Sequence, residues 1–285
     1  MKTTEDMIQL NREQARYYDS IQEAENELGR GTGYAKHRKA NLATRVWASL
    51  RYRQQAAVMA ARLTERQIEA HRRWILPKQG GTILEIGCFS GSHFTFPLID
   101  LAGQYYGIEL SPKAVESLNS QIALKNLAHK ARAVVGDLLE TNEMPLFDVL
   151  HAHAVLHHFE NPVPLFEKLR RLMKPDGLLI FSEPSAVNLA YGLIRTIYRP
   201  FQSDSAWEWP FNRLTVECLE RHFEPLEGFG WGRNSLPLSL MTGLPFVGAI
   251  ATRWYLKTIE REVACGYDRN VWKNSYVTAV CRVRR

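Results

Sequence analysis

Acidic residues and glycines meet where an apolar run of the sequence ends. Residues 83–91 read ILEIGCFSG, so that Glu85 lies near the end of the run and Gly87 and Gly91 follow it. A short apolar run is typical of a buried parallel strand, and glycines after it allow a tight turn where a ligand approaches the backbone. A carboxylate at this place suits a ligand that is cationic or rich in hydroxyl groups.

Further polar residues follow at the ends of the next apolar runs. Glu109 ends the second run, about twenty residues after the first, where a carboxylate can bind a ribose diol. Asp137 and Leu138 follow the third run and suit an exocyclic amine and an adenine face. His151 and His153 end the fourth run. In open α/β sheets ligands bind at the carboxyl ends of the strands, so these residues are expected to converge.

The segments that carry these residues alternate between strand-like and helix-like patterns. This alternation with short connections predicts an α/β fold, in which helices cover both faces of a mainly parallel sheet. We predict strands at 83–86, 105–110, 131–135, 148–152 and 178–182, with helices between them at 93–101, 112–125 and 164–173. The pattern ends with a helix at 214–223, a strand at 227–231 and a strand of alternating apolar and polar residues from Ser275.

The chain divides into an N-terminal helical extension, residues 1–80, and a catalytic-type domain, residues 81–285, with lid-like insertions at about 185–213 and 232–274. In the extension we expect a polar helix at 5–28, a glycine-rich break at 29–33 and a helical region at 41–74.

Charge is unevenly distributed along the chain. Residues 30–78 hold twelve lysines and arginines against two glutamates, a surplus of ten, whereas the whole chain carries +6. This segment is either a solvated helix surface or a binding surface for phosphate, nucleic acid or an anionic membrane. The four cysteines form no C-x-x-C pair, and residues 1–14 lack an apolar core. Both features favour a cytoplasmic protein with reduced thiols, with peripheral membrane contact left open.

Together, the motifs resemble those of the class I S-adenosylmethionine-dependent methyltransferases, in the subgroup of ubiquinone- and menaquinone-type enzymes. ILEIGCFSG is similar to the first motif of that family, YGIELSPKAV to the second, VVGDLLE to the third and FDVLHAHAVLHHFENP to the fourth. LRRLMKPDGLLIFSEP matches the turn and fifth strand that come after them. The resemblance implies a Rossmann-like, seven-stranded methyltransferase sheet and S-adenosylmethionine as the cofactor. The family usually has glycine where this chain has Phe89.

The resemblance also implies roles for individual residues. Glu85 would face the methionyl ammonium group, and Glu109 would bind the ribose hydroxyls, with Leu110 beside the adenine. Asp137 would accept from the adenine amine and Leu138 would flank the ring. The backbone around Gly87, Cys88 and Gly91 would approach the amino-acid and ribose part, and His153 would line the methionyl end. A dinucleotide site would instead need Gly-x-Gly-x-x-Gly, which is not present here.

Histidines after the fourth strand are the candidate general bases. His157 and His158 are the candidate catalytic residues, with His157 expected in a loop that faces the site, although the same pair can simply pack in the structure. A metal site made of His151, His153, His157 and His158 is not expected, because no carboxylate or cysteine pattern accompanies them.

The residues at the end of the fourth strand narrow the acceptor class. The Asn/Asp-Pro-Pro-aromatic motif of adenine and glutamine amino-methyltransferases is replaced by His-Ala-His-Ala, and the Pro-Cys nucleophile of cytosine C5 enzymes is absent. Residues 234–252 carry no formal charge, and they could form a lid or interfacial helix pair, part of the core or, less consistently with their prolines and glycines, a membrane span.

These features favour O-, C- or N-methylation of a hydrophobic small molecule or lipid-like acceptor. Two alternatives stay open: an RNA methyltransferase that uses the basic N-terminal helices, and a non-catalytic module that binds S-adenosylmethionine. The acceptor atom and the oligomeric state are not determined by the sequence.

Overall fold

A seven-stranded sheet forms the centre of the protein. The structure is a computed structural model that describes residues 4–29, 42–141, 143–199, 205–244 and 246–284. The strands lie in the order β3-β2-β1-β4-β5-β7-β6. Their bounds are β1 Thr82–Ile86, β2 Gln104–Glu109, β3 Ala131–Val135, β4 Phe147–His153, β5 Met173–Pro184, β6 Phe223–Trp231 and β7 Tyr276–Val283.

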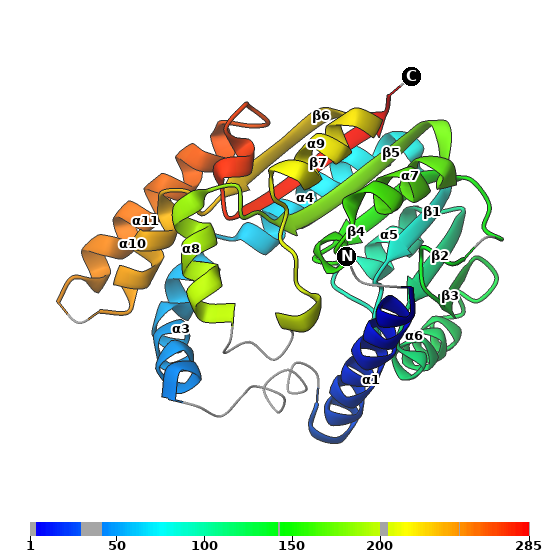
Figure 1. The fold of residues 1–285 in the computed structure, drawn as a ribbon, viewed down its shortest axis with the longest axis horizontal. Coiled ribbons are helices and arrows are strands. Elements are labelled where there is room, and N and C mark those ends of the chain that lie inside the picture. The colour runs from blue at the N-terminus through cyan, green and yellow to red at the C-terminus, as the bar shows by residue number, and fades with distance from the viewer. Residues whose placement is uncertain (1–3, 30–41, 142, 200–204, 245, 285) are drawn as a thin grey trace.

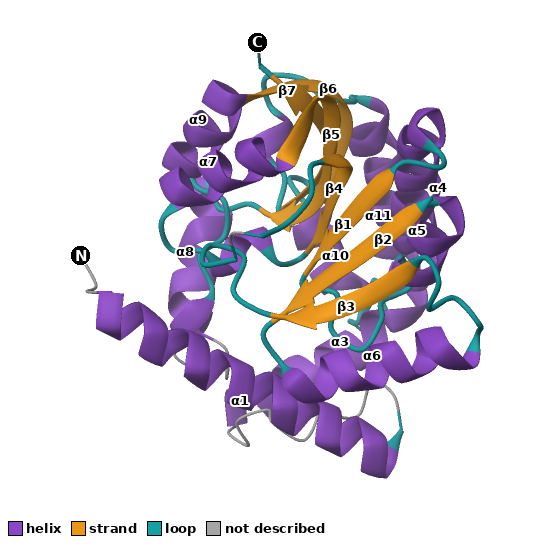
Figure 2. Cartoon of the chain, turned by 90° about the vertical axis from the view of Figure 1, so that its right-hand side faces the viewer, coloured by secondary structure: helices purple, strands orange, loops and turns teal. Residues whose placement is uncertain are grey.

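Strand direction and order determine where a ligand can bind. β1 to β5 pair in parallel, whereas β7 is antiparallel to both β5 and β6. β1 is flanked by β2 on one side and β4 on the other, so the chain reverses its direction of winding beside β1 (Figure 2). A crevice opens at such a reversal, beyond the carboxyl ends of the strands. The predicted α/β fold with a Rossmann-like, seven-stranded sheet is confirmed.

Ten α-helices are described. Two of them begin at a capping side chain followed by proline: Ser111 accepts from the Ala114 N–H at 3.1 Å at the start of α6, and Asn161 accepts from the Val163 N–H at 3.1 Å at the start of α7. The helices are α1 Thr4–Leu28, α3 Leu42–Ala60, α4 Leu63–Ile75, α5 Thr95–Leu101, α6 Pro112–Leu124, α7 Pro162–Leu172, α8 Leu189–Tyr198, α9 Arg213–His222, α10 Ser235–Thr242 and α11 Gly248–Ala264. Short 3-10 turns are η1 Leu76–Lys78, η2 Leu156–His158, η4 Ser205–Trp207 and η5 Val271–Lys273.

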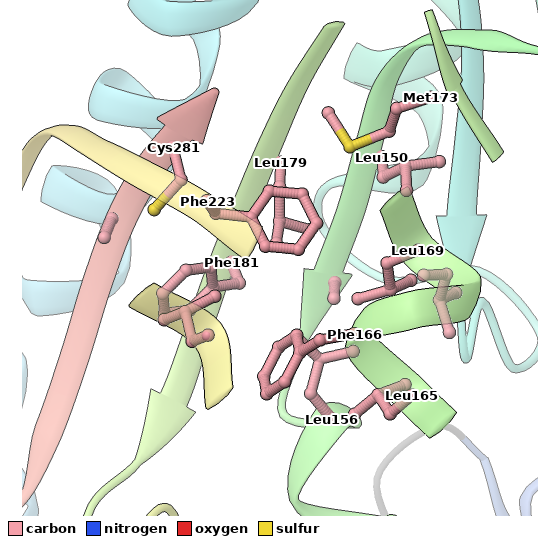
Figure 3. Close-up of a cluster of buried hydrophobic side chains, with 14 of the residues drawn as sticks. Leu150, Leu156, Leu165, Phe166, Leu169, Met173, Leu179, Phe181, Phe223 and Cys281 are labelled. Atoms are coloured by element: carbon pink, nitrogen blue, oxygen red, sulfur yellow. The ribbon is translucent and has the colours of Figure 1, made fainter. Parts of the chain in front are cut away.

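One face of the sheet packs against α7 and α9. Phe166 and Leu169 of α7 are fully buried with Phe181 of β5, Phe223 of β6 and Cys281 of β7 (Figure 3). Each large apolar side chain contributes about 1.5–3 kcal/mol when it is removed from water. This side of the core therefore holds the fourth to seventh strands together.

The other face packs against α4, α5 and α6. Trp74 of α4, Leu98 of α5 and Leu118 of α6 are buried against Ile83 of β1 and Val280 of β7. The N-terminal extension is thus part of the domain core, because α4 covers the sheet as an ordinary crossover helix would.

Three helices form a lobe at one end of the sheet, which we call the helical lobe: α3, α10 and α11. In Figure 1 these helices lie together on the side of the molecule away from β1 to β3. Ala57 and Ala61 of the extension pack with Tyr255 and Ile259 of α11. The uncharged segment 234–252 includes all of α10 and the beginning of α11. Within the described ranges, no helix is both long enough and apolar enough to cross a membrane.

Some boundaries differ from the sequence expectation. The helical region at 41–74 is split, because Arg62 adopts a left-handed conformation (φ 50°) between α3 and α4. β5 begins at Met173, which pairs with Phe147 before residues 174–177 interrupt the register. β6 begins at Phe223 and continues through Pro225, beside which the register also shifts. The predicted glycine-rich break lies beyond Gly29, outside the described residues.

Candidate functional site

A cavity of about 750 Å³ opens at the carboxyl ends of the strands. Residues at the ends of β1, β2 and β4 form its floor, and the loop after β3 and helix α1 form its walls. The residues that line it are Asn11, Gln14, Tyr18, Ile86, Gly87, Phe89, Ile108, Glu109, Leu110, Gly136, Asp137, Leu138, Leu139, Glu140, His153, Ala154, Val155, His158, Phe159, Glu160, Asn161, Pro162, Pro164 and Leu214.

The turn after β1 brings backbone to the cavity. Gly87 has φ 67°, and a Cβ atom there would lie 2.6 Å from the Val155 side chain, so only glycine fits without rearrangement. Phe89, where the related family has glycine, is also left-handed with φ 45°. Left-handed backbone costs a side-chain-bearing residue about 1–2 kcal/mol, which explains why glycine is the usual residue there.

Glu109 is held at the end of β2 by two loops. One carboxylate oxygen accepts from the Phe89 N–H at 3.2 Å and the other from the Ser111 N–H at 3.0 Å. The residue is 8% exposed, and burial raises the pKa of its carboxyl group against the effect of these backbone donors. The carboxylate is therefore fixed at the cavity wall, in a position to accept hydrogen bonds from a diol.

Asp137 lies in the neighbouring loop, after β3. One carboxylate oxygen accepts from the Leu139 N–H at 2.8 Å, and the other accepts from the Asn11 side-chain amide at 2.5 Å. Burial raises the pKa of Asp137. An amide N–H already binds this carboxylate, so the geometry suits an exocyclic amine as a ligand, in place of Asn11 or beside it. Leu138 is 3% exposed and offers an apolar face to the same cavity.

Helix α1 closes the cavity, which the sequence analysis did not predict. Asn11, Gln14 and Tyr18 line it and lie at positions i, i+3 and i+7, on one face of the helix. Asp19 fixes the helix to α6 by accepting from the Ser111 hydroxyl at 2.6 Å (Figure 2). Polar residues at helical spacing were the only sequence signal that α1 could contact a ligand, and the same spacing is found on helices whose polar face is simply exposed to solvent.

His153 and His158 both line the cavity and are both neutral at pH 7. Burial, followed by the charge of His93, lowers the pKa of His153 to about 4. Burial, followed by the charge of His157, lowers the pKa of His158 to about 4. Nδ1 of His158 lies 2.7 Å from the Trp207 carbonyl oxygen and therefore carries the proton. Its Nε2 then accepts from the Tyr18 hydroxyl at 3.2 Å.

His157 has a different position from the one expected. Its side chain is 6% exposed and does not line the cavity; Nδ1 lies 2.7 Å from a Glu183 carboxylate oxygen and Nε2 lies 3.8 Å from Glu208. Burial by itself lowers its pKa, but the hydrogen bond and charge of Glu183 raise it to about 9. The ring is turned away because Glu183 also binds the backbone N–H groups of Val155 and Leu156, which fixes the turn. His157 is thus a cation at neutral pH and unable to accept a proton.

Glu85, Cys88 and Gly91 also do not line the cavity. Glu85 is 2% exposed and accepts from the Tyr105 hydroxyl at 2.6 Å and the Ser92 hydroxyl at 3.2 Å. Cys88 is fully buried in the core beneath the loop, and the Gly91 N–H donates to the Cys88 carbonyl at 3.0 Å. The alternation of side chains along β1 directs Ile86 to the cavity edge and Glu85 to the other face of the sheet. Glu85 therefore does not reach a ligand in the cavity directly.

A buried polar cluster surrounds Glu85 on that other face. His151 Nδ1 lies 3.9 Å from Glu85, and its Nε2 lies 2.9 Å from His71 Nδ1. The other ring nitrogen of His71, Nε2, lies 3.0 Å from the Ser182 hydroxyl oxygen. Burial lowers the pKa of His151 to about 3 and raises that of Glu85 to about 7. The described residues contain no group of three or more histidines, cysteines and carboxylates arranged to hold a metal ion.

The charge of the cavity indicates the kind of ligand that it suits. The described lining residues include four carboxylates, Glu109, Asp137, Glu140 and Glu160, but neither lysine nor arginine. Such a wall attracts a cation and accepts from hydroxyl and amino groups, whereas a pyrophosphate needs donors and positive charge. The residues fit S-adenosylmethionine, which carries a sulfonium, an ammonium group, a diol and an adenine amine.

Comparison with known families gives a match at the same elements. Residues 84–179 match the model of a family described as a methyltransferase domain. That range begins in β1 and ends in β5, so it includes every strand that borders the cavity.

Two curated relatives show how far this likeness extends. A ubiquinone biosynthesis O-methyltransferase of Paraburkholderia xenovorans is 27% identical over 103 residues, which are 36% of this chain and 44% of the relative. A tRNA U34 carboxymethyltransferase of Aeromonas hydrophila is 28% identical over 106 residues, 37% of this chain and 33% of the relative. The chain thus spans less than half the length of either relative. The two have different acceptors, so the shared region does not specify one.

A solved structure extends the likeness to most of the fold. N-methyltransferase NodS from Bradyrhizobium japonicum WM9, solved in complex with S-adenosyl-L-homocysteine, superposes with a TM-score of 0.50 at 15% identity. The superposition covers 94% of this chain and 100% of that chain. At this identity the likeness concerns the fold.

Proposed function

We propose that the protein is a class I S-adenosylmethionine-dependent methyltransferase that transfers a methyl group from this cofactor to a hydrophobic small-molecule acceptor. The cavity is the observation that carries the proposal. The described residues of the cavity include four carboxylates but neither lysine nor arginine. The cavity also has an apolar wall, formed by Val155, Phe159, Pro162, Pro164 and Leu214. The acidic part suits the cofactor and the apolar part suits the acceptor.

Residues of the cavity would divide the binding of the cofactor among them. In this proposal Glu109 accepts from the ribose hydroxyls, Asp137 accepts from the adenine amine, and Leu110 and Leu138 contact the adenine ring. The backbone at Gly87 and the side chain of His153 border the methionyl end. The bound cofactor supplies a methyl group attached to a positively charged sulfur. The protein mainly has to position the acceptor atom in line with that group and exclude water.

A base is needed only if the acceptor must lose a proton, and His158 is better placed for this than His157. His158 is neutral, lines the cavity and directs the lone pair of Nε2 toward Tyr18. A proton from an acceptor hydroxyl could pass to Nε2 directly or through the Tyr18 hydroxyl. The role proposed for His157 becomes one of positioning, because it pairs with Glu183, and that carboxylate binds the backbone of the turn that presents His158.

An RNA acceptor is the second candidate, since one relative is a tRNA-modifying enzyme and residues 30–78 are rich in basic residues. Two observations favour the small molecule. α1 encloses the cavity, which leaves little room for a polynucleotide. On α4, Arg66 and Arg73 form ion pairs with Glu260 and Glu227, so part of the basic surplus is neutralised.

The activity is tested by incubating the protein with methyl-labelled S-adenosylmethionine and a cell extract, followed by separation into lipid-soluble, water-soluble and RNA fractions. We expect label in an organic-soluble small molecule. Label in RNA would replace the proposed acceptor by the second candidate. Tight binding of S-adenosylhomocysteine by calorimetry without any labelled product would instead indicate a non-catalytic binding module. If S-adenosylhomocysteine binds no better than NAD, the cofactor assignment fails.

A further inference from the structure

Large apolar side chains are exposed where α10 turns into α11. Phe246 is 101% exposed, Ile250 is 63% exposed and Trp254 is 53% exposed, with Leu244 and Val247 beside them. We call these five residues the apolar tip. It projects from the helical lobe, away from the sheet, at the end of the molecule opposite the strands β1 to β3 (Figure 1). Scattered exposed apolar residues are common, but five within residues 244–254 mark an interaction site.

The exposure of the tip follows from how α11 is held. Tyr255 and Ile259 lie on one face of the helix and are buried with Ala57 and Ala61 of the extension. Ile250 and Trp254, at i and i+4, lie on another face and are exposed, and Val247 immediately precedes the helix. This packing leaves the apolar face of Ile250 and Trp254 outward, and nothing in the described protein covers that face.

Basic residues follow the apolar tip along the same helix. Arg253, Lys257 and Arg261 are exposed and spaced four residues apart, and the Lys257 ammonium lies 5.7 Å from the centre of the Trp254 ring. The two carboxylates of α11 do not offset this charge. Glu260 pairs with Arg66, and Glu262 is buried, where it accepts from backbone N–H groups including that of Gly232 at 2.9 Å.

We propose that the apolar tip inserts into the headgroup layer of an anionic phospholipid bilayer, while Arg253, Lys257 and Arg261 bind the lipid phosphates. An apolar helix end followed by basic residues is the arrangement of interfacial helices, in which tryptophan lies at the level of the headgroups and long basic side chains reach the phosphates. The adjoining positive charge favours an anionic surface over a second copy of this chain, whose own tip would carry the same charge. Binding of this kind is independent of the acceptor that the protein methylates.

Co-sedimentation with vesicles tests the proposal, using the full-length protein. We expect the protein to bind vesicles of phosphatidylcholine mixed with phosphatidylglycerol more tightly than vesicles of phosphatidylcholine alone. Phe246→Ser with Ile250→Ser should weaken binding about tenfold or more, because two side chains no longer leave water. Arg253→Ala, Lys257→Ala and Arg261→Ala combined should weaken binding to anionic vesicles by about a hundredfold, or about fivefold for each basic residue.

Matched controls distinguish the effect of the apolar tip and its basic residues from the effect of changing any exposed apolar or basic residue. Leu124→Ser removes another exposed apolar side chain, on α6, and Arg170→Ala, Arg171→Ala and Arg221→Ala remove three exposed arginines from α7 and α9. Both controls should bind as wild type does, and circular dichroism should show every variant folded.

Three results would overturn the proposal. Wild-type protein could fail to sediment with anionic vesicles, or the tip variant could bind as tightly as wild type. Alternatively, light scattering could show a dimer that the tip variant abolishes, without vesicle binding, in which case the tip is covered by a second copy.

Discussion

Ionisable residues at the strand ends occur in two settings that differ mainly in what encloses them. On the cavity side, Glu109, Asp137 and His158 border open space and are fixed by one or two hydrogen bonds each. On the enclosed side, Glu85 is surrounded by protein groups, as is His157 between Glu183 and Glu208. Only the first group keeps hydrogen-bonding capacity for a ligand.

Adjacent residues of identical type show this difference most clearly. The rings of His157 and His158 lie 4.2 Å apart, yet one pKa is about 9 and the other about 4. The carboxylate of Glu183 stabilises the charge of the first ring, and that charge together with burial prevents protonation of the second. The enclosed residue therefore helps to keep its neighbour neutral.

The largest effect is expected from His157→Ala. This change leaves Glu183 buried without its cationic partner, so we expect a loss of about 3–5 kcal/mol in the free energy of unfolding, measured by urea denaturation. His158→Ala removes ordinary hydrogen bonds and should cost only about 1 kcal/mol while lowering methyl transfer. Equal losses of stability in the two variants would mean that the two histidines do not differ in the way described.

Glu85→Gln tests the enclosed carboxylate through its dependence on pH. Burial raises the pKa of Glu85 from 4.5 to about 7, so its favourable contribution is present below pH 4.5 and is lost as the pH rises through 7. The difference between those two values corresponds to about 3 kcal/mol. We therefore expect the variant to be more stable than wild type by about this amount at pH 8 and equally stable at pH 4.5. If the free energies of unfolding of wild type and variant differ by the same amount at every pH from 4.5 to 8, the raised pKa of Glu85 is contradicted.

Glu109→Ala tests the cavity side through cofactor binding. Loss of a charged acceptor for the ribose diol should weaken binding of S-adenosylhomocysteine about ten- to a hundredfold by calorimetry, or about 2 kcal/mol. Glu85→Gln is the matched control, since it changes another carboxylate of the same motif region that does not line the cavity. A larger loss of affinity in the control than in Glu109→Ala would reverse the assignment of the two settings.

The smallest effect concerns Phe89, whose ring meets Tyr18 of α1 with centroids 6.1 Å apart. Phe89→Gly and Phe89→Ala both remove this contact, but only glycine adopts φ 45° without cost. The glycine variant should therefore be more stable than the alanine variant by about 1 kcal/mol in thermal unfolding. If alanine is equally stable, the turn is not strained at this residue.

Much of the fold could be predicted from local patterns. Apolar runs followed by glycine or carboxylate predicted the parallel strands, and the helical patterns at 112–125 and 164–173 predicted α6 and α7, although α7 begins earlier, at Pro162. Some observed boundaries differ from the predicted ones because of tertiary pairing. Met173, for example, belongs to β5 because it pairs with Phe147. The split at Arg62 depends on a left-handed backbone that an arginine gives no reason to expect.

The site was only partly predictable, because the sequence shows which residues lie near a strand end but not which of them neighbouring groups enclose. Glu109 and Asp137 line the cavity, whereas Glu85 is enclosed by Tyr105 and Ser92 and does not reach it. Asn11 and Tyr18 lie more than sixty residues before the first strand, and no local pattern relates them to it.

The sequence by itself determined the alternation of strands and helices across the parallel part of the sheet and the carboxylates near three strand ends, and the resemblance of its motifs implied S-adenosylmethionine as the ligand. The alternation and the carboxylates follow from residue type and spacing along the chain. Only the tertiary structure decided that α1 closes the cavity, that His158 and not His157 faces it, and that the end of α11 remains exposed. Burial and electrostatic environment depend on which distant segments pack together, and that packing is a property of the whole chain.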